Sequence, residues 1–473
     1  MITRSSPMLK IALISSYASP LAVSGSVDCD SLGFYVGQLG SELGALGCQV
    51  DIFTRRDRIE QPQVHFWRPN VRIIHVPAGP PGVFGREPLQ PYIEQFGRFM
   101  VGFARRQRGG YDIAHACDLR SGCAAQQLRR TLGVPYVVTL HAPPAQQGSA
   151  AAVALQQQLL KDADSVLVLC RRQRDALQGV SGGRHTRIDI VPCGFDPALF
   201  WPVRLRARVV LGLPTDAFLV LHVGRLGPGH DIDTAIEGIA QLAGQHAVTA
   251  RLLVLGAAVP DEGGHLARPL DALLSHQPCE TPQSTRSQQS STSQSLDQSH
   301  PSVQSHQLSH LGEFNRLRDL AIRLDVEVAF LGPQPASALR HWYSAADVCI
   351  ATSCYNAFGA AVLAAMACAT PVVGCIDGAV VDGETGYLIA PRDPAALADR
   401  LASLHANPVQ ARSFGVQGWR RAHRHYTWRS VAQRLTAVYA QVLAGVAADV
   451  AADGACELAG KVASKVGASA SLA

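Results

Sequence analysis

The sequence contains no long hydrophobic run, although 47% of its 473 residues are apolar. None of its apolar stretches reaches the roughly 18 residues that a membrane-spanning helix needs. The N-terminus also lacks the pattern of a signal peptide, because serines interrupt the apolar stretch that follows Lys10. These absences argue against an integral membrane protein and predict a cytoplasmic one.

The sequence also lacks cysteines at the spacings typical of metal-binding sites. The twelve cysteines include no C-x-x-C pair, and most of them fall within patterns typical of strands or helices. We therefore expect buried free thiols rather than disulfides or a zinc site.

Charge is sparse, because charged residues make up 17% of the chain and the formal net charge is only +5. The arginine pairs are dispersed along the sequence and lack interleaved aromatic residues. This pattern argues against a nucleic-acid partner.

A length of 473 residues exceeds what one core usually supports, so we expect two domains of about 200 residues each. Residues 10–15 form an apolar run suited to a first parallel strand. Helical spacing follows over residues 34–47, and residues 49–54 suit the next strand. This βαβ opening predicts an open, doubly wound sheet with helices on both faces.

The same alternation continues and then restarts in the second half. Further strands are predicted at residues 71–76, 113–116, 136–139, 165–169, 218–223, 251–255, 328–331 and 348–351. Further helices are predicted at residues 89–105, 123–132, 171–177, 232–243, 311–324 and 339–345. A final amphipathic helix is marked by Trp428, Val431, Leu435, Val438, Tyr439 and Val442. The fold class is therefore α/β, with two Rossmann-like halves.

Two segments fit neither half. Residues 276–310 are mainly Gln, Ser, Thr and His, so they bury too little apolar surface to offset the entropy of ordering. We expect a disordered insert there. The tail at residues 447–473 is rich in Ala, Gly, Ser and Val, and we expect a frayed helix or a flexible segment.

Two stretches carry sequence motifs. Residues 191–202 read V-P-C-G-F-D-P-A-L-F-W-P, and residues 353–373 read S-C-Y-N-A-F-G-A-A-V-L-A-A-M-A-C-A-T-P-V-V. The second motif predicts a turn, a helix and a strand, with Gly359 where the helix begins and Pro371 after its end. Free amides at that helix N-terminus favour an anion above the carboxyl edge of the sheet.

Both motifs resemble signatures of the family-4 glycosyltransferases, which have the GT-B fold. The first matches V-P-x-G-x-D-x-x-x-F-x-P at every fixed position. The resemblance covers residues 8–445 outside the insert. It implies two Rossmann-like, doubly wound domains that face a cleft, and a C-terminal crossover helix. The implied parts are an acceptor-side domain (8–200), a nucleotide-sugar-side domain (201–425), the crossover helix (426–446) and the flexible tail (447–473).

The second motif, at residues 353–373, corresponds to the family's nucleotide-sugar (donor) motif. It matches that motif at many fixed positions but lacks its charged residues. In the family it reads S-x-x-E-P-F-G-x-x-x-L-E-A-M-A-x-G-x-P-V-V. Phe358 and Gly359 match it, whereas Asn356 and Ala364 replace the two glutamates and Ala369 replaces the second glycine. Each lost charged hydrogen bond to a ligand would cost about 1.5–3 kcal/mol of binding.

A second family loop, V-G-R-L-x-x-x-K-G, is altered in the same direction. Arg225 matches its arginine, but His230 replaces the lysine and Asp231 replaces the glycine. A neutral imidazole compensates a diphosphate poorly at pH 7, and a carboxylate repels an anion. The glycine loop at residues 28–31 and the shortened segment at residues 374–383 also depart from the family pattern. The resemblance therefore implies a degenerate donor site.

Candidate site residues follow from these positions. Arg225, His230, Phe358, Gly359 and Ala364 are the candidate donor-binding positions. His115 and His141 match family positions at strand ends and are, with Asn356, the candidate catalytic residues. Each histidine fits a structural role as a polar residue at a strand end equally well.

The resemblance implies retaining transfer of a hexosyl group from a nucleotide-sugar to an unknown acceptor. It implies no metal, and the lost charges predict weak or altered activity. The alternative is a catalytically inactive pseudo-glycosyltransferase that acts as a binding or scaffolding partner of another protein. The resemblance also leaves peripheral contact with a membrane open.

Overall fold

The structure is a computed structural model that describes residues 9–21, 30–82, 91–141, 150–180, 187–224, 226, 231–256, 301–352, 359–375 and 378–469. The chain divides into two compact units. Unit 1 comprises Met1–Gly194 and His425–Ala473, and unit 2 comprises Phe195–Arg424. Each unit contains its own sheet, so the prediction of two separate Rossmann-like sheets is confirmed.

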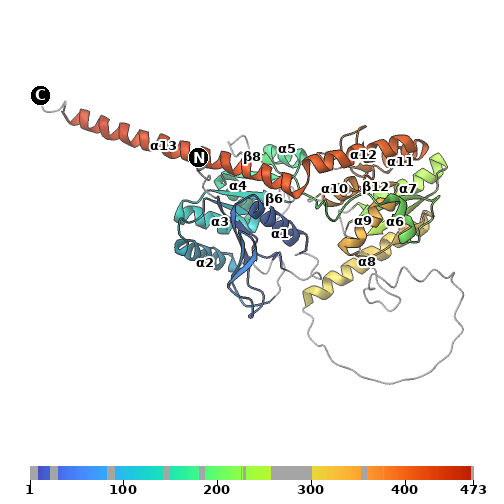
Figure 1. Ribbon diagram of the computed structural model, residues 1–473, viewed down its shortest axis with the longest axis horizontal. Helices are drawn as coiled ribbons and strands as arrows, with labels where there is room; N and C mark the ends of the chain where they lie inside the picture. Colours follow the sequence, from blue (N-terminus) through green and yellow to red (C-terminus); the bar gives the residue numbers. More distant parts are fainter. Residues whose placement is uncertain are drawn as a thin grey trace, which may run out of the picture. The chain divides into compact units, whose positions relative to one another are not determined.

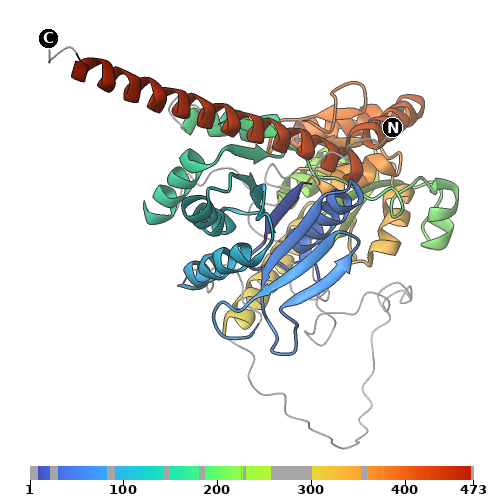
Figure 2. The ribbon, with the colours of Figure 1, turned by 60° about the vertical axis from the view of Figure 1, so that its left-hand side comes forward.

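Unit 1 contains an eight-stranded sheet in the order β3-β4-β2-β1-β5-β6-β7-β8. Its N-terminal strands are the blue arrows of Figure 2. Its strands are β1 (Lys10–Ile14), β2 (Gln49–Arg55), β3 (Val64–Arg68), β4 (Val71–Val76), β5 (Ile113–Ala116), β6 (Tyr136–Leu140), β7 (Ser165–Val168) and β8 (Ile188–Ile190). All neighbouring strands pair in parallel except β3, which forms an antiparallel edge with β4. The edge strand β3 was not predicted from the sequence.

Helices cover both faces of this sheet. They are α1 (Asp30–Ala45), α2 (Ile93–Arg106), α3 (Leu119–Leu132), α4 (Ala150–Asp162), α5 (Arg171–Val180) and α13 (Trp428–Ser469). Ala12 and Ile14 of β1 share a core with Phe96 of α2. Side chains alternate along a strand, so Leu13 faces the other way, toward α1. The α1 face also carries α13 (Figure 1).

Unit 2 contains a six-stranded, fully parallel sheet in the order β11-β10-β9-β12-β13-β14. Its strands are β9 (Phe218–Val223), β10 (Ala250–Leu255), β11 (Val328–Phe330), β12 (Val348–Ala351), β13 (Val372–Gly374) and β14 (Gly386–Leu388). Its helices are α6 (Arg204–Val210), α7 (Ile232–His246), α8 (Pro301–Arg323), α9 (Ala336–Ala345), α10 (Ala360–Ala367), α11 (Pro394–Ala406) and α12 (Pro408–His425), which ends just past the boundary between the units.

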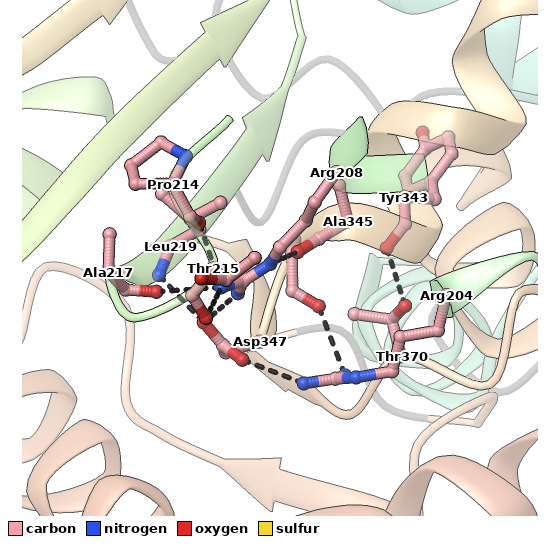
Figure 3. A network of polar contacts seen from close by, with 11 residues as sticks. Arg204, Arg208, Pro214, Thr215, Ala217, Leu219, Tyr343, Ala345, Asp347 and Thr370 are labelled. Carbon is pink, nitrogen blue, oxygen red and sulfur yellow. Dashed lines mark hydrogen bonds and ion pairs between the residues drawn. The ribbon is translucent and has the colours of Figure 1, made fainter. Parts of the chain in front are cut away.

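A partly buried ion network fastens α6 to the amino edge of this sheet (Figure 3). Asp347, directly before β12, accepts hydrogen bonds from the guanidinium groups of Arg204 at 2.8 Å and Arg208 at 2.6 Å. The backbone N–H of Leu219 in β9 also donates to Asp347, at 2.8 Å. Arg208 donates further to the carbonyl of Ala345 at 3.0 Å. One carboxylate therefore joins α6, β9 and β12.

The C-terminal helix α13 packs on unit 1, as the family resemblance implied. Its buried residues recur at helical spacing and include Trp428, Val431, Leu435, Tyr439 and Val442. The helix does not end near residue 446, however, because α13 is continuous to Ser469. Of the two alternatives expected for residues 447–473, the helix is the one found up to Ser469, and it continues α13 without a break at residue 446. The alanine-rich composition, which lacks proline, supports a continued helix.

The predicted insert is also shorter than expected. Helix α8 begins at Pro301 rather than at residue 311, so residues 301–310 are helical. Proline is well suited to a first helical turn, where its missing N–H has no partner to lose. Residues 276–300 lie outside the described residues. Within the described residues, none of the helices combines the length and apolar character needed to cross a membrane.

Candidate functional site

The predicted donor positions cluster after two neighbouring strands of unit 2. Strands β9 and β12 pair in parallel, so their carboxyl ends meet at one edge of the sheet. Arg225 and His230 follow β9, whereas Asn356 and Phe358 follow β12. These four residues lie outside the described residues, so the structure places only the backbone that leads into and out of them.

Glycines bring the strand ends close together at this edge. A Cβ atom on Gly256, after β10, would lie 2.9 Å from the carbonyl oxygen of Gly224, after β9. Gly256 also has φ +90°, a conformation that favours glycine. A Cβ atom on Gly224 would lie 3.1 Å from Nε2 of the buried His222. The backbone of this edge is therefore tightly constrained.

Asp231 stands where the family motif has a glycine, and its backbone conformation is one that glycine adopts readily. Its φ is +50°, a left-handed conformation that Asp tolerates better than most residues. Its carbonyl oxygen accepts a hydrogen bond of 2.8 Å from the Thr352 hydroxyl, which follows β12. These contacts fix the start of α7 against the end of β12.

The charge of Asp231 is also partly balanced. The Nε of Arg392 donates to Oδ1 of Asp231 at 3.2 Å. The Asp231 side chain is only 10% exposed, whereas that of Arg392 is 72% exposed, so solvent screens part of this attraction. Sequence reasoning missed Arg392, because its contact with Asp231 arises only from the fold. The repulsion expected between Asp231 and an anion is therefore weaker than the sequence suggested.

Gly359 opens helix α10 at the same edge. It adopts a left-handed conformation with φ +56° at the N-cap, and none of the residues that the structure describes lies within 4 Å of the position of a Cβ atom. The first turn of α10 contains no acidic residue. An anion at this helix N-terminus would therefore meet free backbone amides and a favourable dipole.

Ala364 lies in the second turn of α10 and is 3% exposed. Its methyl group offers no polar contact to a ligand. Ala369, which stands at the position of the motif's second glycine, has φ +57°, a left-handed conformation that glycine adopts readily. The side chain at Ala364 thus offers no polar chemistry, while the backbone at Ala369 is of a kind that suits the glycine of the motif.

The two candidate histidines lie in unit 1. His115 is fully buried in β5, with Nδ1 2.7 Å from the Tyr439 hydroxyl and Nε2 2.7 Å from the Thr139 hydroxyl. Burial, with a smaller effect of His141, lowers the pKa of His115 to about 3. Its two ring nitrogens are thus occupied by contacts inside the unit. These contacts fit the structural role better than a direct role in catalysis.

His141 directly follows β6 and is 9% exposed. Its ring packs edge-on against Tyr35 of α1, with ring centroids 4.8 Å apart. The structure therefore brings both histidines close to the same face of the unit 1 sheet. Of the two, His141 lies nearer to the carboxyl edge, because it follows the last residue of its strand.

The intact 191–202 motif has a clear structural basis. A Cβ atom on Gly194 would lie 2.6 Å from the Trp428 indole, so only glycine allows this approach. Oδ1 of Asp196 accepts a hydrogen bond of 2.8 Å from the backbone N–H of Ala198, which closes a tight turn. The fixed glycine and aspartate of the motif therefore determine the local backbone.

Comparisons with known proteins agree with this architecture. Residues 32–194 match a glycosyl transferase 4-like domain, and residues 294–407 match the glycosyl transferases group 1. D-inositol 3-phosphate glycosyltransferase 1 of Catenulispora acidiphila is 30% identical over 457 residues, which cover 93% of this chain and 98% of that relative. D-inositol 3-phosphate glycosyltransferase of Corynebacterium efficiens is 29% identical over 454 residues, which cover 92% and 95%.

Solved structures show the same fold. Sucrose-phosphate synthase from Thermosynechococcus elongatus superposes with a TM-score of 0.71 and 27% identity, over 92% of this chain and 100% of that one. An Anabaena protein in complex with UDP-glucose has a TM-score of 0.61 and 16% identity, over 92% and 100%. The fold is therefore that of the GT-B glycosyltransferases. The chain belongs to the group 1 glycosyltransferases, with a 4-like N-terminal domain.

Proposed function

We propose that this protein transfers a glycosyl group from a nucleotide-sugar bound at the carboxyl edge of the unit 2 sheet. The observation that carries the proposal is Gly359, whose left-handed backbone opens α10 at this edge. A diphosphate there would accept hydrogen bonds from the first amides of α10. The family of the chain supports the same reaction class.

Around this anion we assign roles by motif position. Arg225 would pair with the diphosphate, and His230 would add charge only when protonated. Asn356 would contact the sugar hydroxyls through its amide, next to Phe358. The donor then needs no metal, because the guanidinium and the helix N-terminus together compensate the diphosphate charge.

We further propose that the reaction retains the anomeric configuration and that its rate is low. Ala364 supplies no hydrogen bond for the ribose, and His230 is a weaker cation than lysine. His141 is the better histidine candidate for contact with the reacting sugar, and His115 would position α13 through Tyr439. For the acceptor, the names of the relatives make D-inositol 3-phosphate the first compound to test.

The alternative is a pseudo-glycosyltransferase that binds a protein partner without turnover. The buried methyl group of Ala364 favours it, because a side chain without polar atoms cannot anchor a ribose. The two functions differ in turnover. A cytoplasmic location and peripheral contact with a membrane stay predictions, and both are compatible with either function.

The test is transfer by the purified full-length chain with UDP-, GDP- and ADP-sugars and D-inositol 3-phosphate. Proton NMR of the product reports its anomeric configuration, and nucleotide release reports turnover. Slow but measurable transfer with retention supports the proposal. Donor binding without turnover supports the pseudoenzyme, and transfer with inversion contradicts the retaining mechanism.

A further inference from the structure

The amino edge of the unit 1 sheet holds a cavity of about 400 Å³. It lies where β1, β2 and β4 begin, since Lys10 pairs in register with Gln49, and Val50 with Val71. This is the opposite edge from the carboxyl ends of the strands, where ligands of open α/β sheets usually bind. Its volume is at the lower end of the roughly 300–1,000 Å³ of small-molecule sites.

The floor of the cavity is a rigid, fully paired charge network. Arg72 donates two hydrogen bonds to the Asp51 carboxylate, at 2.7 and 2.6 Å. The Tyr111 hydroxyl donates a third at 2.5 Å, and Asp51 is only 5% exposed. Arg72 also donates to Oε1 of Gln107 at 3.2 Å. The only carboxylate among the described lining residues is thus already occupied by internal donors.

The rim carries cations that this network does not use. Lys10, Arg68 and Arg108 line the cavity, and within the described part of the chain none of them forms an ion pair with a carboxylate side chain. The Lys10 ammonium donates one hydrogen bond, of 2.5 Å, to the carbonyl of Arg108, which leaves two of its three donors available. The Arg68 guanidinium lies 5.3 Å from the centre of the Trp67 ring, within the range of a cation–π contact.

An apolar surface completes the wall. Phe66 of β3 lines the cavity and is 78% exposed, a large exposure for an aromatic side chain. Its ring lines the same cavity as Lys10, Arg68 and Arg108, for which the described residues supply no carboxylate partner. The cavity therefore offers cationic donors for an anion beside an exposed aromatic ring.

We propose that this cavity binds a small organic phosphate with a flat ring, of the size of a mononucleotide, at a site separate from the donor edge of unit 2. The phosphate would accept hydrogen bonds from Lys10, Arg68 and Arg108, and the ring would stack on Phe66. The paired floor of Asp51, Arg72 and Tyr111 would hold the shape of the cavity and add no free negative charge.

The probe is AMP, titrated calorimetrically into the full-length chain, with inorganic phosphate and adenosine as its two halves. We expect AMP to bind, inorganic phosphate to bind more weakly, and adenosine to bind most weakly. Arg68→Ala and Arg108→Ala should each weaken AMP binding about tenfold or more, because each removes a charge-assisted hydrogen bond. Phe66→Ala should weaken AMP binding without changing that of inorganic phosphate.

The matched control is Arg172→Ala, which removes the same charge from an exposed position on α5 away from the cavity. It should leave AMP affinity unchanged. Arg68 and Arg108 are exposed, so their variants should keep the melting temperature of the parent chain. The proposal is overturned if AMP does not bind. It is also overturned if UDP-glucose displaces AMP while the Arg68 and Arg108 variants still bind AMP.

Discussion

Nδ1 of His115 lies 2.7 Å from the hydroxyl of Tyr439, although 324 residues separate the two in sequence. This contact joins β5, in the centre of the unit 1 sheet, to the C-terminal helix α13. Both residues are fully buried. The return of the chain to unit 1 is thus secured by a polar contact as well as by the apolar face of α13.

Tyr439→Phe should destabilise unit 1 by about 1–2 kcal/mol, because it leaves a buried ring nitrogen without a partner. Urea unfolding followed by circular dichroism measures the loss. Tyr387→Phe is the matched control, since its hydroxyl lies at a longer 3.4 Å from Ser403. Equal losses in the two variants would show that the Tyr439 contact contributes nothing specific.

The buried His115 should also make stability depend on pH. Burial lowers its pKa to about 3 in the folded protein, whereas an unperturbed histidine titrates near pH 6.5. Between these values the unfolded chain binds the additional proton, so this contribution is complete above about pH 6.5 and is lost as the pH falls toward 3. His115→Gln should flatten the decline between pH 6.5 and 4, measured by urea unfolding at each pH. The surface variant His246→Gln should retain the steep decline.

Ala369→Gly should stabilise unit 2 by up to about 1 kcal/mol. The left-handed conformation costs a residue with a Cβ atom about 1–2 kcal/mol, and the added backbone freedom of glycine when unfolded offsets about 0.4–1 kcal/mol of the gain. Ala361→Gly is the control, because it places the same substitution inside α10 and should destabilise by about 1 kcal/mol. Thermal unfolding of both variants decides, and a destabilised Ala369→Gly would contradict the argument.

Arg208→Lys should destabilise unit 2 by about 2–3 kcal/mol, since an ammonium cannot reproduce the planar set of hydrogen bonds. One guanidinium contacts Asp347 and the carbonyl groups of Pro214, Thr215, Ala217 and Ala345. Arg206→Lys on the same helix is exposed and should be neutral within about 0.5 kcal/mol. The midpoint of chemical unfolding distinguishes the two.

Residue patterns predicted both sheets because buried parallel strands are short apolar runs, as in Lys10–Ile14 and Phe218–Val223. They missed β3, whose sequence V-H-F-W-R mixes polar and aromatic residues at a half-exposed edge. They also missed the start of α8, because a Gln/Ser-rich composition resembles a disordered segment. Local composition is a poor guide to secondary structure where contacts with neighbouring elements determine whether a strand or helix forms.

The sequence motifs predicted where the candidate site lies along the chain, but they did not predict which charged residues pair there. The motif frame located Gly359 and Ala364, but the pairing of Asp231 with Arg392 joins residues 161 positions apart. The amino-edge cavity also depends on the fold. Lys10 of β1, Arg68 of β3 and Arg108, which follows α2, line one cavity only when the four strands in the order β3-β4-β2-β1 are assembled. Contacts of this kind follow from strand order, which no short motif contains.

Charged side chains restored at the donor motif should strengthen donor binding. Replacing Ala364 by Glu, together with Asn356→Glu and His230→Lys, should raise nucleotide-sugar affinity, because the backbone of α10 persists while its polar side chains are missing. Ala364→Glu alone should strengthen binding about tenfold or more if its carboxylate accepts hydrogen bonds from the ribose. Because Ala364 is 3% exposed, the same variant should melt at a lower temperature without ligand.

Ala360→Glu is the matched control for this charge. It adds a carboxylate to the exposed first turn of the same helix, where it should repel the diphosphate and weaken binding. Isothermal titration of the parent chain and the variants with UDP-, GDP- and ADP-sugars measures the differences. Micromolar binding with rapid turnover by the parent chain would contradict the degenerate site, since another set of residues would then hold the donor. Equal affinities of Ala364→Glu and Ala360→Glu would show that the second motif position no longer faces the ligand.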